Sequence, residues 1–163
     1  MGKPIIQYRK SDLYDRVVDE YDVFSSSYDF LLFLAMVGYR EDNPKRNNYI
    51  GDRSEGTLGE IGLQNVYSNE LYRVLMASLA FQDTNDPEAL VDSSKQMKVL
   101  AQYAAGGLEI AENEFGHTAG DPTNAVLNYI EEHREPTEDF EGELGKIVER
   151  FDNQMMDGAA GEE

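Results

Sequence analysis

The sequence predicts a mainly α-helical fold, a single-domain bundle of about five to six helices with at most one short strand or hairpin. Two observations lead to this class. Over most of the chain, apolar residues recur three or four positions apart, the spacing of the buried stripe of a helix. The alternation that marks a half-buried strand occurs in only one short stretch, residues 60–67. We expect residues 1–135 to form the helical domain and residues 136–163 to form an acidic extension, part helical and disordered at its end.

The first helix is expected over residues 11–21. Ser11 is a suitable N-cap, because its hydroxyl can accept a hydrogen bond from a free backbone N–H of the first turn. Leu13 and Val17 lie on the predicted inward stripe. The opposite face carries carboxylates with no histidine or glycine-containing calcium loop beside them, so we interpret it as solvated: Asp12, Asp15, Asp19 and Asp22.

A second helix is expected over residues 28–39, where a run of apolar residues leaves no polar face, so the helix should be surrounded on all sides. The serines at positions 25–27 can cap its start, and Gly38 is expected to end it. The polar segment 40–59 is predicted to be an exposed loop. Residues 60–67 are expected to form a short strand or an extended connector.

Further helices are expected in the second half of the chain. One spans about residues 68–81, and its predicted inner stripe is Leu71, Val74, Leu75, Ser78 and Leu79. Asp86 before Pro87, and Asp121 before Pro122, each combine an N-cap with a proline at the first helical position. They predict a short helix over residues 88–91 and a later helix with the apolar residues Val126, Leu127 and Ile130. In the extension, residues 141–155 could form a helix on Leu144, Ile147, Val148 and Phe151.

Residues 93–115 are predicted to form one long helix that contains the pair Gly106 and Gly107. A glycine inside a helix costs about 1 kcal/mol relative to alanine, so the pair needs a reason. Gly107 falls on an apolar stripe that keeps its phase across the pair: Met97, Leu100, Ala104, Leu108, Ala111 and Phe115. We therefore predict a continuous helix whose packing motif lets another backbone approach closely: Tyr103, Gly106, Gly107 and Leu108. In the alternative, the glycines end one helix and begin another.

The charge balance is strongly acidic, with 32 Asp and Glu against 14 Lys and Arg and a formal net charge of −18. Such self-repulsion is tolerable where salt screens it, because the Debye length falls to about 3 Å at 1 M salt. The composition therefore predicts a halophilic host. The alternative is an acidic face that imitates nucleic acid, and on either interpretation unaided binding to DNA phosphate is disfavoured.

The composition also indicates a cytoplasmic protein without a membrane contact. The chain has no cysteine, which removes thiol catalysis, disulfides and cysteine-type zinc sites. Its N-terminus is polar where a secretion signal would have an apolar core. The longest apolar run, residues 28–39, is too short to span a bilayer.

No catalytic or cofactor site can be assembled from the sequence, so we expect no catalytic residue, no cofactor and no metal. The two histidines, His117 and His133, are too far apart in sequence to suggest a helical metal pair. Neither a GxxxxGK[ST] phosphate loop nor a GxSxG nucleophile motif occurs. A metal-dependent nuclease commonly places a lysine near its carboxylates, and none follows Glu60 on the predicted strand.

The run QYAAGGLEIAENEF, with FLLFLAMVGY upstream and IGLQNVY between, resembles the dnd system-associated protein 4 family in an acidic, haloarchaeal-type form. The family's pattern of a tyrosine, a small residue, another residue, two glycines and an apolar-acidic-apolar run is matched by residues 103–110, and its Gly-Asp-Pro by residues 120–122. The similarity covers about residues 10–135. Members are encoded beside genes for DNA phosphorothioation, which replaces a non-bridging phosphate oxygen by sulfur, and for the linked restriction machinery. The resemblance implies no catalytic residues.

We therefore expect a non-enzymatic accessory protein of a phosphorothioation-linked restriction-modification defence system. Its expected partners are other proteins of the modification or restriction machinery, which it would bridge or restrain. One alternative is a DNA-binding or DNA-sensing module, with weak DNA contact, that reaches phosphate through Arg9, Lys10, Lys45 and Arg46. Another alternative is an acidic inhibitor that mimics DNA.

Overall fold

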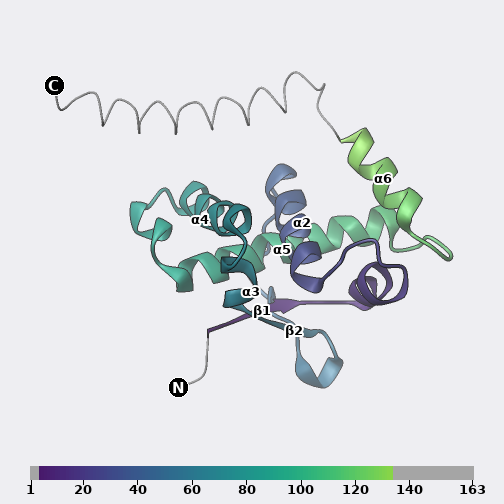
Figure 1. The fold of residues 1–163 in the computed structure, drawn as a ribbon, viewed down its shortest axis with the longest axis horizontal. Coiled ribbons are helices and arrows are strands. Elements are labelled where there is room, and N and C mark those ends of the chain that lie inside the picture. The colour runs from purple at the N-terminus through teal and green to yellow at the C-terminus, as the bar shows by residue number, and fades with distance from the viewer. Residues whose placement is uncertain (1–3, 134–163) are drawn as a thin grey trace. The chain divides into compact units, whose positions relative to one another are not determined.

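The computed structural model describes residues 4–133, and the chain divides into two compact units, residues 1–125 and residues 126–163, which are taken one at a time. Within the described part, the chain forms six α-helices and one two-stranded antiparallel sheet, so the predicted mainly α class is confirmed (Figure 1). The predictions for residues 136–163 lie outside the described residues. None of the described helices has the length and apolar content needed to cross a membrane.

The sheet joins β1 (Ile5–Arg9) to β2 (Leu58–Gly62), with Gln7 opposite Glu60. Strand β1 was not expected, because its charged and polar neighbours hide a short alternation in which Ile6 and Tyr8 point into the core. The strand expected over residues 60–67 is partly wrong. It starts earlier and gives way at Leu63 to a short helix, α3 (Leu63–Tyr67).

The expected first helix is present in two parts, α1 (Asp12–Tyr14) and a π-helical segment, η1 (Asp15–Glu20). Ser11 caps α1, with its hydroxyl oxygen accepting from the Leu13 N–H at 3.3 Å. Leu13 and Val17 are buried, while the four aspartates of the opposite face are exposed. Arg16, between these aspartates in sequence, donates to the backbone carbonyl oxygens of Gly116, Thr118 and Gly120.

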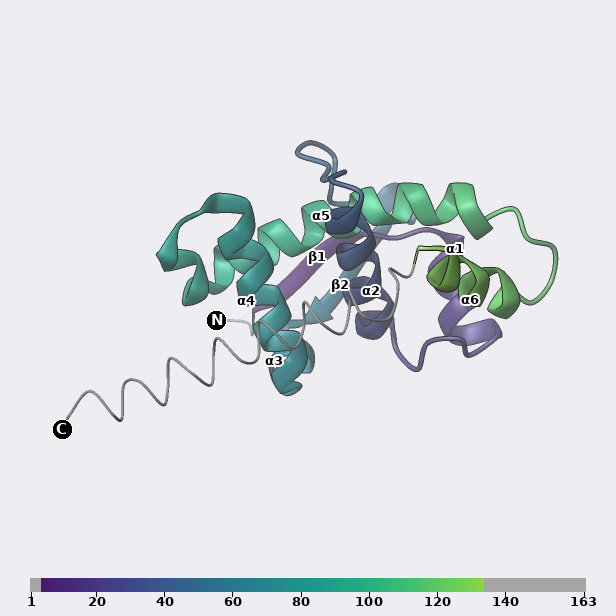
Figure 2. The same ribbon diagram turned by 90° about the horizontal axis from the view of Figure 1, so that it is seen from above.

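Helix α2 (Ser27–Arg40) crosses the middle of α5 (Ser93–Phe115), the longest described helix, as both Figure 1 and Figure 2 show. Ser26 caps α2 and Asp29 lies in its first turn, where a carboxylate suits the helix dipole. The prediction that Gly38 ends this helix is wrong. The helix continues to Arg40 and stops where Asp42 takes a left-handed backbone conformation, because Gly38 is used for the crossing and not for a turn.

Segment 40–59, predicted to be a loop, contains a 3-10 turn, η2 (Arg53–Glu55), and the start of β2. Helix α4 (Glu70–Thr84) then follows, capped by Asn69. After α4 in the sequence, Asp86 caps a 3-10 turn, η3 (Pro87–Leu90), at the predicted Asp-Pro start.

The predicted inner stripe of α4 is confirmed at Leu79, which is buried, but is wrong at Leu71 and Val74, which are 62% and 57% exposed, and at Ser78, which is exposed as well. Leu75 is half-buried. The inward face is another helical stripe: Tyr72, Met76, Leu79, Ala80 and Asp83. Polar anchors at both ends turn this face inward. The Tyr72 hydroxyl donates to Asp29 of α2, and Asp83 accepts from Tyr103 of α5.

Helix α6 (Thr123–Glu132) begins at the second Asp-Pro pair, where Asp121 accepts from the Thr123 N–H at 2.9 Å. Val126 and Tyr129 are buried within it. Leu127 and Ile130, predicted as part of its apolar set, are exposed, because each follows a buried residue by one position and so lies about 100° further around the helix.

Candidate functional site: a loop held on helix α5

Helix α5 runs without a break through the glycine pair, and Gly107 lies where α2 crosses it. A Cβ atom on Gly107 would overlap the backbone carbonyl oxygen of Leu34, and one on Gly38 would overlap that of Tyr103. The two helices therefore touch backbone to backbone at a glycine on each side. Side chains of ordinary size keep helix axes about 8–10 Å apart, and only glycine permits this closer approach.

Gly106 has a different neighbour, the segment that follows α2. A Cβ atom there would overlap the carbonyl oxygen of Asn43, whose amide nitrogen donates to the Gly106 carbonyl oxygen at 3.2 Å. The backbone N–H of Asn43 also donates to the carbonyl oxygen of Gly38 at 2.8 Å. Each glycine of the pair therefore makes room for a separate piece of backbone, one for α2 and one for the loop.

The loop that follows, residues 41–50, is fixed on α5 and α4 by Arg46. Its guanidinium makes a two-pronged ion pair with Asp83, with one N–O distance of 3.0 Å, and donates to the Gln102 side chain at 2.7 Å. The Tyr103 hydroxyl donates to the same carboxylate at 2.8 Å, and the guanidinium lies 5.7 Å from the centre of the Tyr103 ring.

The charges of this cluster are mutually supporting. The hydrogen bonds from Arg46 lower the pKa of Asp83 below its ordinary value, which keeps the carboxylate ionised. Burial, followed by the hydrogen bond to Asp83, raises the pKa of Tyr103 to about 12, so its hydroxyl stays protonated and donates. Since the three side chains come from the loop, α4 and α5, this one cluster joins three segments.

The four predicted DNA-contacting cations have separate surroundings. The Lys45 ammonium lies 2.5 Å from the Glu109 carboxylate, and Arg46 is held by Asp83, so both charges are already balanced by acids. The Arg9 Nε donates to the Asn48 carbonyl oxygen at 2.8 Å, and the residue is half-buried. The backbone N–H of Lys10 donates to Thr57, and its side chain is half-buried. DNA contact through these four residues stays a prediction.

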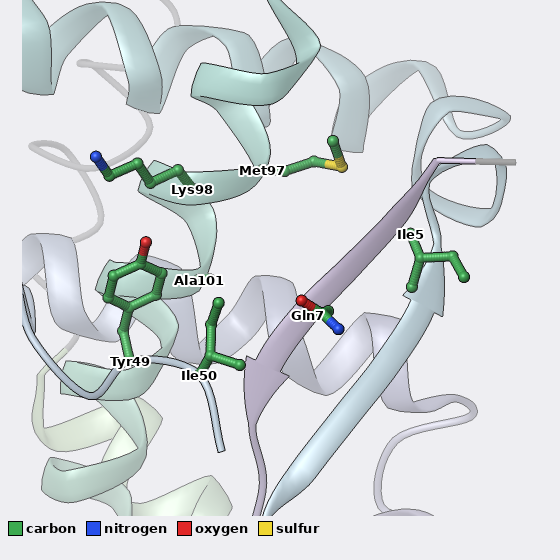
Figure 3. Close-up of a pocket in the computed structure, with 7 residues that line it drawn as sticks. All are labelled: Ile5, Gln7, Tyr49, Ile50, Met97, Lys98 and Ala101. Carbon is green, nitrogen blue, oxygen red and sulfur yellow. The ribbon is translucent and has the colours of Figure 1, made fainter. Parts of the chain in front are cut away.

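A hollow of about 170 Å³ lies beside the loop, between β1 and α5 (Figure 3). Seven residues line it: Ile5 and Gln7 of β1, Tyr49 and Ile50 of the loop, and Met97, Lys98 and Ala101 of α5. Figure 3 shows the Tyr49 hydroxyl and the Lys98 chain on one side and Gln7 on the strand opposite. Neither Lys98 nor Gln7 was predicted as a site residue, because only the fold brings residues so distant in the chain together.

The aspartates of the first helix do not come together with other ligands. Within residues 4–133, no group of three or more histidine, aspartate or glutamate side chains is arranged to hold a metal ion. His117, in the turn after α5, is exposed.

The fold and the site define a class of protein. It is a mainly helical chain in which α2 and α5 cross in contact through glycines, and in which the polar loop 41–50 is bound beside this crossing. The chain belongs to the DNA sulphur modification system-associated protein 4 family, whose sequence model matches residues 8–147. The resemblance seen in residues 103–110 is thereby confirmed. The family's description names an association with a DNA sulphur modification system and no catalytic activity. No curated protein and no solved structure matches the chain.

Proposed function

We propose that this chain is a non-enzymatic accessory protein of a DNA sulphur modification system, and that it acts in the cytoplasm by contact with another protein of the modification or linked restriction machinery. The family supports the association with such a system. The contact is supported by a surface, formed by α4 and η3, on which large apolar side chains face solvent.

This surface, the α4–η3 surface, consists of two elements that pack against each other. Leu71 and Val74 of α4 are more than half exposed, Val91 beside η3 is 86% exposed, and Leu90 is nearly half exposed. Single exposed apolar residues are ordinary, but a group on neighbouring elements is typical of a protein-contacting surface. In a chain with a net charge of −18, where repulsion opposes association, such a group is also the feature best able to bind another protein.

The α4–η3 surface is held rigidly from behind. Tyr72 and Asp83 anchor the two ends of α4 to α2 and α5. The Gln96 side chain donates to the Ala89 carbonyl oxygen of η3 at 2.8 Å and accepts from the Tyr67 hydroxyl. A surface that is ordered before binding loses less entropy when a partner docks, which favours affinity.

Co-purification of the full chain with each protein of the sulphur modification and linked restriction machinery, expressed one at a time, tests this proposal. The variant carrying Leu71→Glu and Val91→Glu places charges on the surface without opening the core, and it should lose the partner that the unmodified chain retains. Leu127→Glu is the matched control, because Leu127 is 52% exposed but lies in the other unit. Retention of every partner by the double variant, or no partner for the unmodified chain, would refute the proposed contact.

The non-enzymatic part has its own test. The purified chain is incubated with unmodified and with phosphorothioated plasmid DNA in the presence of Mg²⁺ or Mn²⁺, and the products are separated by electrophoresis and mass spectrometry. We expect both plasmids to remain intact and unaltered. Cleavage or sulfur exchange that follows the protein through a second purification step would overturn this part.

A further inference from the structure

We propose that the hollow between β1, the loop and α5 binds a nucleotide, with an unpaired base inside the hollow and its phosphate on the cations at the rim. This site is separate from the α4–η3 surface, so the two binding activities do not depend on each other.

The size of the hollow limits what it can hold. Pockets for drug-sized ligands enclose about 300–1,000 Å³, whereas this one encloses about 170 Å³. It has room for one planar ring but not for a whole nucleotide, so any attached sugar and phosphate would stay outside. Figure 3 shows Lys98 and the Tyr49 hydroxyl together on one side of the hollow, and the proposed site places the sugar and phosphate on that side.

The lining has the chemistry that a base requires. Tyr49 provides an aromatic ring for stacking, and Ile50 and Met97 provide apolar contacts. The Gln7 side chain presents one amide oxygen and one amide nitrogen, which can pair with the acceptors and donors on the edge of a base. The strand holds Gln7 on its outer face, opposite Glu60.

Among the residues that line the hollow, the one charged side chain is a cation, Lys98, whereas the chain as a whole is strongly acidic. None of the residues that line it is acidic, although the chain has 32 acidic side chains. Lys98 is exposed, and no carboxylate in the described part of the chain lies within ion-pair distance of it. Arg9 is two residues beyond Gln7 on the same face of β1, a distance of about 7 Å along a strand. In the proposed site Lys98 meets the phosphate of the bound nucleotide, and Arg9, further along β1, meets a neighbouring phosphate of the same strand.

The test is fluorescence anisotropy of the full chain with a labelled single-stranded oligothymidylate of ten nucleotides. We expect saturable binding that Tyr49→Ala weakens by about fivefold or more, as for other stacking residues. Lys98→Gln should also weaken it, whereas Tyr49→Phe should retain it. The matched control is Arg73→Gln, which removes one exposed cation from α4, away from the hollow, and should leave binding unchanged.

Two further arms identify the source of the nucleotide and the mode of contact. Thymidine monophosphate as competitor tests a free nucleotide, and an abasic oligonucleotide, which should not bind, tests the need for the ring. With two phosphate contacts, the slope of log affinity against log salt should be no steeper than about −1.4.

Absence of binding, equal loss in Lys98→Gln and Arg73→Gln, or full binding of the abasic chain would overturn the assignment. Thermal unfolding of each variant shows whether it is folded, and the exposed position of Lys98 keeps one arm decisive if Tyr49→Ala does not fold.

Discussion

Replacing Gly107 by alanine should destabilise the protein, although the same change stabilises most helices. In an unconstrained helix interior, glycine to alanine gains about 1 kcal/mol. Here the added Cβ atom would overlap the carbonyl oxygen of Leu34, which is backbone and cannot rotate away. The helices α2 and α5 would have to separate, and overpacking of this kind costs up to about 3 kcal/mol. The net loss in the free energy of unfolding is therefore about 2 kcal/mol.

For a chain of this size, a loss of about 2 kcal/mol lowers the Tm by roughly 4–8 °C. Thermal unfolding followed by circular dichroism in high salt measures this shift. Gly62→Ala is the matched control, because Gly62 has a negative φ and a Cβ there would meet only the Asn65 side chain, at 3.6 Å. Its Tm should change by no more than a degree or two. A Tm for Gly107→Ala equal to or above that of the unmodified protein would show that the helices do not meet at this glycine.

Two further predictions concern charge. Asp83→Asn should lower the Tm at neutral pH, because the variant loses the ionised partner of Arg46. The folded-state pKa of Asp83 is lowered, so the difference in Tm between the variant and the unmodified protein should be fully present above the unfolded pKa of about 3.9. It should vanish as the pH falls through the folded-state pKa. A difference between the two proteins that is independent of pH would contradict this. The net charge of −18 predicts that the Tm of the unmodified chain rises between 0.1 M and 1 M KCl, as the Debye length falls from about 10 Å to about 3 Å, and a flat or falling Tm would show that self-repulsion does not limit stability.

The features that the sequence predicted well are those with a local cause. The capping side chains of Ser11 and Asp86 each accept from a backbone N–H two residues away, so a short window of sequence contains all the information needed. The apolar period across Gly106 and Gly107 likewise predicted an unbroken helix, because a stripe that keeps its phase leaves no room for a turn.

The features that were missed depend on partners far along the chain. The inward face of α4 was predicted from Leu71 and Val74, whereas Tyr72 and Asp83 decide it through bonds to other helices. A tyrosine or aspartate in a helical pattern looks like a surface residue until its partner is known. The hollow beside Lys98 is hidden for the same reason, since it exists only after β1 and α5 have come together.

The hydrogen bonds from Arg16 to the backbone of residues 116–120 limit how far the chain can be shortened from its N-terminal side. The Arg16 guanidinium binds the carbonyl oxygen of Gly116, the C-cap of α5, from a position 100 residues earlier, and a cation is favoured there by the negative end of the helix dipole. A fragment that starts after η1 would keep every residue of α5 and still lose the side chain that holds the turn after this helix. Segment η1 therefore belongs to any fragment in which residues 116–120 are to keep the arrangement seen here.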